Sequence, residues 1–523
     1  MWHRRMKQKK MPKTLYLFNQ KLPFWVDPAQ VFTELFAKQD YSFWLDSSMP
    51  AKNLARFSFI GAIGMDTSSK IALSSTLSRL IDYSVHKQQV RCQYLHQPAK
   101  HSPGCHNTKQ QNIFDFLQRA LAETEHQVLG DPLPFAFDCG FVGYLGYELK
   151  GDLTGNRAHQ NPLPDACFIQ TDRAIVFDHL KHQVYLLCLL AEPEQTTATS
   201  WFKQMRHRLD LLAQTPQPKR QLGIHKLAPG HNKSIAEDLT QTKANYLQDI
   251  HTCQQKIRAG ESYEICLTNR LRSETHTEPL DYYLRLRQEN PTPYAAFFRF
   301  ANTAIACFSP ERFLQISQQK NGKYRAESKP IKGTIRRDSH PDEDQYLRNQ
   351  LKHSTKDRAE NLMIVDLVRN DLGMVCTPGS VRVDKLMAIE TYAKVHHMVS
   401  TISGVLKSEQ DSIDCIKALF PAGSMTGAPK IRTMEIVDQL ESGARGVYAG
   451  ALGYIGFNGM VDLNVVIRTA VFQKYNQQPH QQPHKPYQVS INSGGAITVL
   501  SDAKQEFDEL ILKISALWKG LYT

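Results

Sequence analysis

The residue best placed to do chemistry is Lys332, within the heptapeptide Ser328-Lys329-Pro330-Ile331-Lys332-Gly333-Thr334. Pro330 restricts the backbone before the lysine, and Gly333 permits close approach of a ligand or another segment after it. This setting suits an amine that must meet a small molecule at a set angle. Taken alone, however, the heptapeptide is more typical of a basic surface turn, because lysines are mostly exposed.

Two pairs of carboxylates are spaced to share one helix face each. Asp357 and Glu360 are three residues apart, and so are Glu506 and Glu509. Two helices that each present such a pair can close on Mg²⁺, which takes one or two carboxylates and keeps other positions for water or ligand oxygens. Each pair by itself is more typical of a solvated helix face.

Glu311 and Arg468 are charged residues in apolar surroundings. Glu311 follows a predicted strand at 303–309, and Arg468 stands inside the predicted strand 460–472. A semi-buried arginine usually has an anionic partner, often in bidentate geometry. Turn chemistry is the default for Glu311 alone, but a charged pair between an apolar strand and Phe313 is oddly placed unless it has a use.

Two glycine-containing segments predict anion sites. The stretch 420–430 precedes a helix, so its amide groups, with Thr426 and Lys430, predict an anion site. Gly494 and Gly495 close a strand with free amide groups that can grip a second carboxylate.

His396 and His397 are adjacent in a predicted strand at 393–406. Their rings face opposite sides, so they cannot chelate one metal together. One ring can face a site, and His397, with Thr334, is a candidate substrate ligand. The residues together indicate an enzyme that acts on a small polyanion.

The net charge of +12 on 523 residues invites a nucleic-acid interpretation. Six of the charges lie in the first 13 residues, which predict a basic disordered tail; the cations are Arg4, Arg5, Lys7, Lys9, Lys10 and Lys13. A non-catalytic basic binding protein is therefore a weak alternative, and we expect no nucleic-acid partner.

The ten cysteines contain no C-x-x-C pair, and most adjoin apolar residues. They predict buried free thiols in a reducing compartment. No apolar run of about 18–20 residues is present, and no apolar segment follows the basic start. We therefore expect a cytoplasmic protein without a membrane partner.

The order of elements predicts an α+β fold. Runs of strands without regular βαβ alternation indicate two large antiparallel sheets, packed as a sandwich with helices on the outer faces. A Gln-, Pro- and Lys-rich stretch predicts a boundary between interleaved domains at 14–225 and 240–520. One long helix is expected from about 342 to 372, and another strand at 446–457.

Six motifs resemble those of the chorismate-utilising enzymes, and they cover essentially residues 243–518. They are Ser309-Pro310-Glu311-Arg312-Phe313, Pro330-Ile331-Lys332-Gly333-Thr334, Asp357-Arg358-Ala359-Glu360-Asn361, Asp366-Leu367-Val368-Arg369-Asn370-Asp371, Gly427-Ala428-Pro429-Lys430 and Gly494-Gly495. Residues 14–220 resemble the more variable domain of the members that aminate chorismate.

Within this family, Lys332 separates the branches. Members that form anthranilate typically have alanine at this position, whereas members that form 4-amino-4-deoxychorismate, the precursor of 4-aminobenzoate in folate synthesis, have lysine. The resemblance therefore implies the second activity, with anthranilate formation as the alternative. Members that add water to chorismate carry a lysine base at the position aligned with Ile265, which disfavours that chemistry here.

The resemblance also implies roles for individual residues. Lys332, as a free amine with a depressed pKa, would attack C2 of chorismate while Glu311 protonates the departing C4 hydroxyl. Mg²⁺ would be held by Glu360 and Glu509, with Asp357 and Glu506 less certain. Further substrate ligands would be Arg468, Tyr454, Gly494, Gly495, Thr426, His397 and Thr334.

Two partners follow from the resemblance. Ammonia would come from a separate glutamine amidotransferase subunit or from solution, because no cysteine stands in a Gly-x-Cys-x-Gly elbow. Tryptophan would lie at Ser47, Pro293 and Tyr294, although Ala295 and Asp46 depart from the pattern of the anthranilate-forming members. Structural binding, regulatory binding and no binding of tryptophan all remain open.

Overall fold

The computed structural model describes residues 13–49, 55–63, 77–94, 106–215, 234–475 and 486–522. Nearly all of the predicted basic tail and much of the predicted domain boundary lie outside these ranges. The division into two domains thus stays a prediction.

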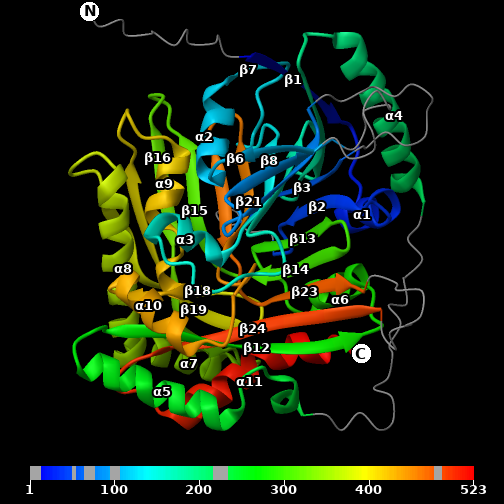
Figure 1. Cartoon of the computed structure of the whole chain (residues 1–523). Helices are drawn as coiled ribbons and strands as arrows, with labels where there is room; N and C mark the ends of the chain where they lie inside the picture. Colours follow the sequence, from blue (N-terminus) through cyan, green and yellow to red (C-terminus); the bar gives the residue numbers. More distant parts are fainter. Residues whose placement is uncertain are drawn as a thin grey trace, which may run out of the picture.

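Two twelve-stranded sheets form the frame of the protein (Figure 1). In the first sheet the strands run, in spatial order, β20 (Gly427–Ala428), β12 (Glu264–Thr275), β24 (Tyr487–Ile497), β23 (Thr469–Lys474), β14 (Thr303–Ser309), β13 (Tyr294–Phe300), β2 (Tyr41–Asp46), β3 (Phe57–Ala62), β10 (Arg173–Asp178), β11 (Gln183–Leu190), β1 (Lys13–Leu22) and β7 (Thr124–Leu129).

The second sheet, like the first, places strands from distant parts of the chain side by side. Its strands are β17 (Ile331–Arg336), β19 (Val395–Val405), β16 (Tyr324–Lys329), β15 (Arg312–Gln318), β22 (Val461–Val465), β21 (Ala451–Gly456), β8 (Gly140–Leu145), β9 (Ala166–Thr171), β4 (Arg79–Ser84), β5 (Gln89–Gln93) and β6 (His106–Gln110), with β18 (Arg382–Thr391) paired to β19. Every pairing in the two sheets is antiparallel except that of β1 with β7. The α+β prediction and the interleaving of early and late strands are confirmed.

Helices cover the outer faces of the sheets. Against the first sheet lie α1 (Pro28–Leu35), α4 (Gln195–Gln214), α5 (Lys243–Arg258), α6 (Pro279–Glu289) and α11 (Ala503–Lys519). Against the second lie α2 (Ile113–Ala122), α7 (Pro341–His353) and α8 (Thr355–Val375), with α9 (Ser412–Leu419) packed on α8. Helix α10 (Lys430–Leu440) contacts β12 and β20 of the first sheet, and α3 (Lys150–Thr154) is a short remaining helix. Figure 1 shows α5 and α11 beside β12 and β24.

Strand β12 shows how the two-residue period builds this arrangement. Ile265, Leu267 and Leu271 pack in the core beneath the helices, whereas Cys266 belongs to the core between the sheets. Successive side chains of a strand point to opposite faces. Even-numbered residues of β12 therefore face the interior between the two sheets.

Two predicted elements are wrong in their extent. The helix expected from 342 to 372 is broken, because Ser354 ends α7 and caps α8 by accepting a hydrogen bond from the Asp357 amide. The strand expected at 460–472 is two strands in different sheets: β22 ends at Val465, and β23 begins at Thr469. Arg468 lies at this crossover with a φ of 50°.

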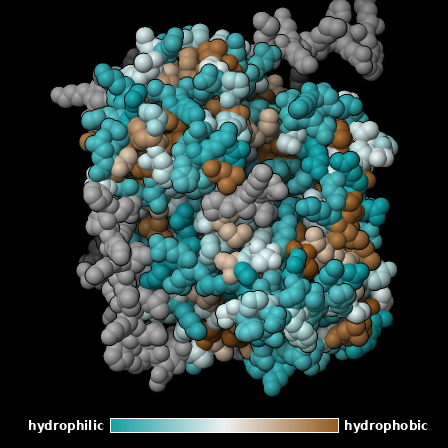
Figure 2. Space-filling model, turned by 180° about the vertical axis from the view of Figure 1, so that it is seen from behind, coloured by the Kyte–Doolittle hydropathy of each residue, from teal (hydrophilic) through white to brown (hydrophobic). Residues whose placement is uncertain are grey.

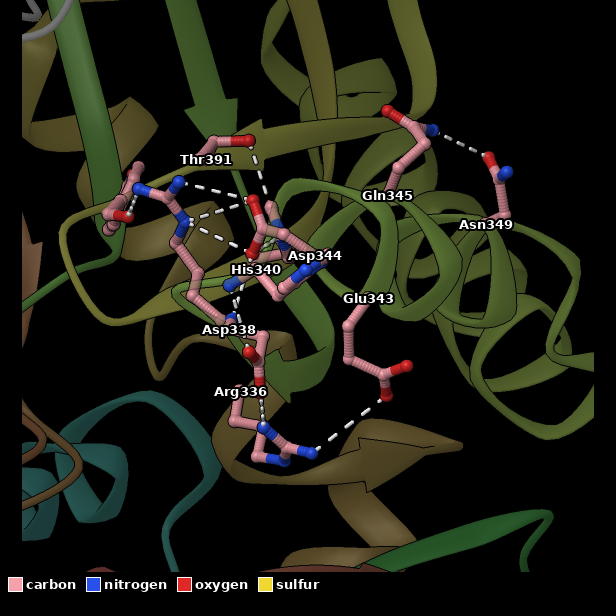
Figure 3. A network of polar contacts seen from close by, with 11 residues as sticks. Arg336, Asp338, His340, Glu343, Asp344, Gln345, Asn349 and Thr391 are labelled. Carbon is pink, nitrogen blue, oxygen red and sulfur yellow. Dashed lines mark hydrogen bonds and ion pairs between the residues drawn. The ribbon is translucent and has the colours of Figure 1, made fainter.

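Polar contacts anchor the loop that leads from β17 to α7 (Figure 3). The Asp344 carboxylate accepts hydrogen bonds from the Arg337 guanidinium at 3.1 Å and from the Asp338 amide at 3.0 Å. The Arg337 bond holds the pKa of Asp344 well below its usual range. Asp344 Oδ1 also lies 3.0 Å from His396 Nε2, and the Thr391 hydroxyl lies 2.9 Å from His396 Nδ1. These contacts fix β19 next to Lys332.

The cysteines and the molecular surface agree with what the amino-acid composition predicts. The nine cysteines in the described part of the chain are free and buried, as predicted; Cys105 lies outside it. None of the described helices is long and apolar enough to cross a bilayer. The face in Figure 2 is largely hydrophilic, with apolar side chains in scattered small patches.

Gly333 tests how tightly β17 is held against α8. Its φ is +88°, and a Cβ atom there would lie 2.9 Å from the Cβ atom of Asp357. We expect Gly333→Ala to lower the free energy of unfolding in urea by more than the ~1 kcal/mol of backbone strain alone. The control is Gly379→Ala, where φ is +77° and nothing lies within 4 Å. Equal losses in the two variants would show that α8 yields to the new methyl group.

Candidate active site

A cavity of about 170 Å³ lies where strands of the two sheets meet around Lys332. Strand β17 contributes Lys332 and Thr334, and β19 contributes His397. Other walls of the cavity are formed by Glu311, Ser424, Tyr448, Arg468, Gly494 and Gly495. The structure thus brings five of the predicted catalytic and substrate-binding side chains, and both predicted glycines, to one cavity.

Seven of the nine predicted catalytic and substrate-binding residues line the cavity: Lys332, Glu311, Arg468, Gly494, Gly495, His397 and Thr334. Two do not. Thr426 is fully buried and its hydroxyl donates to the carbonyls of Ala422 and Gly423. Tyr454 lies in a different cavity.

Lys332 is a buried ammonium with a carboxylate beside it. Its Nζ atom lies 2.6 Å from Oε1 of Glu264, and the two side chains are 11% and 1% exposed. Burial alone would lower the pKa of Lys332, but Glu264 and then Glu360 outweigh burial and raise it above its ordinary value. The predicted depressed pKa is therefore wrong for the ligand-free protein.

Glu264 is the functional neighbour that the sequence did not reveal. Its side chain is on the inner face of β12, and its second oxygen, Oε2, is buried without a hydrogen-bond partner among the described residues. Ile265, by contrast, packs on the helix side of the sheet. Ile265 points away from Lys332, so its lack of a basic group does not show that Lys332 has no base beside it. The preceding residue, Glu264, is the one that contacts Lys332.

Glu311 is set up as a proton donor. Burial raises its pKa to about 7, although the Ser424 hydroxyl, Lys332 and the Ile331 amide all favour the charged form. Ser424 donates to Oε1 of Glu311 over 2.8 Å. A carboxyl group with a pKa near 7 is protonated in a substantial fraction of molecules at neutral pH.

Arg468 and His397 are the two cationic or titratable residues predicted to bind an anion in this cavity. Burial lowers the pKa of Arg468, and its left-handed backbone is a strained conformation of the kind that clusters at functional sites. Burial, with the nearby Arg468, lowers the pKa of His397 to about 3, so its ring is neutral. His397 Nδ1 lies 2.7 Å from the Thr334 hydroxyl, while Nε2 is buried without a partner among the described residues.

The two glycines permit close packing beside this cavity. A Cβ atom on Gly494 would lie 2.2 Å from the Leu267 carbonyl oxygen, and one on Gly495 would lie 2.9 Å from Oε2 of Glu506. A larger side chain is thus excluded at Gly494 by the backbone, whereas one at Gly495 would have to displace the Glu506 carboxylate. This brings the cavity wall next to the carboxylates of α11.

The predicted metal ligands lie beside the cavity. Lys356 Nζ bridges α8 and α11, at 3.9 Å from Glu360 Oε1 and 3.2 Å from Glu506 Oε1. Glu360 Oε1 is buried and without a hydrogen-bond partner among the described residues, and burial raises the pKa of Glu360 to about 7. A buried carboxylate oxygen without a hydrogen bond fits a cation.

Glu509 and Asp357 are placed differently. Glu509 pairs with Lys513 at 2.8 Å and is about half exposed, while Asp357 packs against Gly333. No group of three or more metal-ligating side chains occurs within the described ranges. Glu506 and Glu360 both lie near Lys356, whereas Glu509 pairs with Lys513, and the choice between Glu506 and Glu509 as the second magnesium ligand stays a prediction.

Two other sequence predictions are corrected by the packing. Lys430 is not free for an anion, because it donates to Asp371 at 2.6 Å and to the Leu419 carbonyl at 2.9 Å. Tyr448 lines the Lys332 cavity in place of Tyr454. Both tyrosines lie within the strand predicted at 446–457, but the strand begins only at Ala451, so Tyr448 lies in the preceding turn.

A second cavity, of about 380 Å³, brings together Ser47, Pro293 and Tyr294, the three residues predicted to hold tryptophan. Tyr454 lines it as well. Asp46 also lies in its wall, but this carboxylate already accepts hydrogen bonds from Arg287 and, at 3.1 Å, from the Tyr283 hydroxyl. The three predicted residues therefore share one site of a size that suits a small molecule, and its occupant stays a prediction.

Comparison with known proteins identifies the class to which this fold and this cavity belong. Residues 80–519 match the family described as chorismate binding enzyme, and the chain belongs to that family. The solved structure of anthranilate synthase component I from Streptococcus pneumoniae TIGR4 superimposes with a TM-score of 0.65 at 24% identity, over 94% of this chain and 97% of that one. This likeness confirms the predicted fold.

Two curated relatives are similar over nearly the whole chain. Aminodeoxychorismate synthase of Streptomyces griseus is 39% identical over 98% of this chain and 65% of its own length. Anthranilate synthase component 1 of Synechocystis sp. is 31% identical over 94% of this chain and 93% of its own length. The chain spans less than two thirds of the length of the aminodeoxychorismate synthases that it matches.

The Lys332–Glu264 pair makes a prediction that does not depend on any substrate. Glu264→Gln removes the charge that most strongly opposes the effect of burial on Lys332. We therefore expect the pKa of Lys332 to fall and its amine to react at lower pH. Acetylation of Lys332 across a pH series, read by peptide mass spectrometry, measures this shift.

The matched control is Glu390→Gln, which removes the partner of Lys329 at 2.8 Å on the neighbouring strand. This control should leave the Lys332 labelling curve unchanged. An unshifted curve in Glu264→Gln would contradict the assigned cause of the raised pKa.

Proposed function

We propose that the protein converts chorismate and ammonia to 4-amino-4-deoxychorismate, the precursor of 4-aminobenzoate in folate synthesis. The observation that carries the proposal is that Lys332 and Glu311 line the same cavity as Arg468 and His397. The higher identity to aminodeoxychorismate synthases than to anthranilate synthases adds support. Anthranilate formation is the second candidate, favoured by the similarity to the Synechocystis relative over almost its whole length.

In the proposed reaction, Lys332 forms a covalent bond to the substrate. The ammonium first loses a proton, and Glu264, 2.6 Å away, is placed to accept it. The amine then adds at C2, the ring double bonds shift, and the C4 hydroxyl leaves as water with the proton of Glu311. Ammonia adds at C4, the bond from C2 to the lysine breaks, and the Glu311 carboxylate takes the extra proton from the new amine. Two displacements thereby replace one difficult substitution.

The other residues hold the substrate and its charge. Arg468, His397, Thr334 and the amides of Gly494 and Gly495 would bind the two carboxylates, with Tyr448 in the wall. Glu360 with Glu506 or Glu509 would hold Mg²⁺, whose charge would neutralise the ring carboxylate of chorismate. A separate glutamine amidotransferase subunit would supply ammonia in the cytoplasm, and tryptophan would occupy the cavity at Ser47, Pro293 and Tyr294.

The product distinguishes the two candidates. We expect the purified chain, with chorismate, Mg²⁺ and ammonium, to form 4-amino-4-deoxychorismate, which chromatography detects and which yields 4-aminobenzoate only after a lyase is added. Fluorescent anthranilate appearing without a lyase would overturn the proposal in favour of the second candidate.

The covalent step predicts a mass change. With chorismate and Mg²⁺ but no ammonia, intact-mass spectrometry should show the protein increased by chorismate minus water. Lys332→Ala should abolish this adduct and lower the ammonia-dependent rate by about 10²-fold or more. Lys329→Ala, three residues earlier at the end of β16, is the control and should retain the adduct. A Lys332→Ala variant of undiminished rate would rule out an obligatory nucleophile.

The pKa of Glu311 predicts the alkaline side of the pH profile. Because the acid must be protonated to act, activity should fall as the pH rises through about 7. The Ser424 hydrogen bond stabilises the carboxylate, so Ser424→Ala should raise the pKa and move this limb to higher pH. Glu311→Gln should lower the rate by about 10²- to 10⁴-fold and remove the limb. An unmoved limb in Ser424→Ala would exclude Glu311 as its source.

A further inference from the structure

A third cavity, of about 210 Å³, adjoins the Lys332 cavity along the inner face of the first sheet. Tyr448 and Asn492 line both cavities. Strands β12, β24 and β23, which lie side by side in Figure 1, form its floor, and the segments 161–163 and 445–448 close it. Nothing in the proposed reaction uses this space.

Three arginines line this cavity, and only one of them has its charge compensated. Arg445 donates to Glu441 at 2.7 Å and to the carbonyls of Met425 and Cys266. Arg270 and Arg272, which share the inner face of β12, form no ion pair within the described residues, and Nε of Arg270 is buried without a hydrogen-bond partner there. Burial, with the charge of Arg272, lowers the pKa of Arg270.

The nearest acids are already engaged. Glu441 accepts hydrogen bonds from Arg445 and from the amide and hydroxyl of Thr268. Glu148 accepts from the backbone amides of Arg445 and Gly446 at 2.7 and 2.8 Å. Neither carboxylate forms an ion pair with Arg270, although both oppose the lowering of its pKa from a distance.

Asn161 adds a neutral hydrogen-bond donor to the wall of this cavity. Nδ2 of Asn161 is buried without a partner among the described residues, while Oδ1 accepts from the Leu163 amide at 3.3 Å. The Asn161 amide group packs against Gly446, where a Cβ atom would lie 3.2 Å away. A half-buried guanidinium and a buried amide, both lacking acceptors, carry an uncompensated desolvation cost.

We propose that this cavity is an oxyanion site, in which Arg270, Arg272 and Asn161 bind a carboxylate or phosphate group of a small anion. Guanidinium groups match such anions in bidentate geometry, and an acceptor-rich ligand would satisfy both orphan donors at once. Because the cavity shares two wall residues with the Lys332 cavity, the anion would lie beside the bound substrate. The occupant is either a free oxyanion or the carboxylate of the substrate on its way to Lys332; only the second possibility rests on the proposed function.

Inorganic phosphate tests the site without any turnover. In thermal melts at constant ionic strength, we expect phosphate, compared with chloride, to raise the Tm of the wild-type protein. Arg270→Gln should lose this increase, and titration calorimetry should show the Kd for phosphate weakened by about tenfold or more. Arg348→Gln, an exposed position on α7, is the matched control and should keep the full response.

The anion-free melt separates a ligand site from a structural arginine. Removing an uncompensated, half-buried charge should leave the Tm of Arg270→Gln equal to or above that of the wild type. A structural arginine would instead lower the Tm when replaced. Should Arg270→Gln fail to fold, which would itself count against the proposal, Arg272→Gln gives the independent measurement of the phosphate response.

Chorismate kinetics then identify the source of the anion. A rise in KM of about tenfold in Arg270→Gln with kcat kept, together with competitive inhibition by phosphate, assigns the site to the substrate. A lost phosphate response with KM unchanged assigns it to a separate anion. An equal phosphate response in wild type and variant, or no response to phosphate together with an unchanged KM, overturns the proposal. A protein without the proposed activity that still shows the Arg270-dependent response would refute the function and leave the site standing.

Discussion

A buried ammonium group must have negative charge beside it, and this constraint shapes the centre of the molecule. Lys332 lies between Glu264 on one sheet and Glu360 on a helix that covers the other. The side chain stays charged without a ligand, although burial alone favours the neutral amine. The surrounding carboxylates therefore keep the lysine protonated, and a protonated amine is not a nucleophile.

The two sheets hold these groups together because each contributes different chemistry. In the second sheet the edge strand β17 carries the lysine and its neighbour β19 carries the histidine, and the first sheet carries Glu264 and the glycines. Arg468 lies at the crossover between the sheets, in the strained turn that carries the chain from β22 to β23. Its position is thus fixed by both sheets at once, as the proposed contact with an anion between them requires.

The sequence was sufficient for the fold class and for most of the cavity, because strand periodicity and helix spacing act locally. Lys332, Glu311, Arg468 and His397 were all recognisable as polar residues in apolar or restricted settings. What could not be predicted depends on contacts between distant segments. The choice between Tyr448 and Tyr454 depends on where a strand begins, and Thr426 faces its own turn.

The electrostatic state of the lysine was unpredictable for the same reason. Glu264 lies 68 positions before Lys332 in the chain, in an apolar strand whose buried face could not be assigned without its neighbours. A carboxylate that comes this close reverses the sign of the pKa shift expected from burial. Similarly, the break at Ser354 was visible as a capping residue, but the continuous helical spacing on both sides concealed it.

The mixing of early and late strands has a consequence for how the chain is made. Strand β2 pairs with β13, and β8 pairs with β21, more than 240 and 300 residues later. A ribosome therefore releases the early strands long before their partners exist, and both sheets present unpaired edges until the last strands emerge. Such long-range pairing slows folding and exposes segments prone to aggregation. Production of this protein in cells should therefore depend on chaperones more than production of a chain whose strands pair in sequence order.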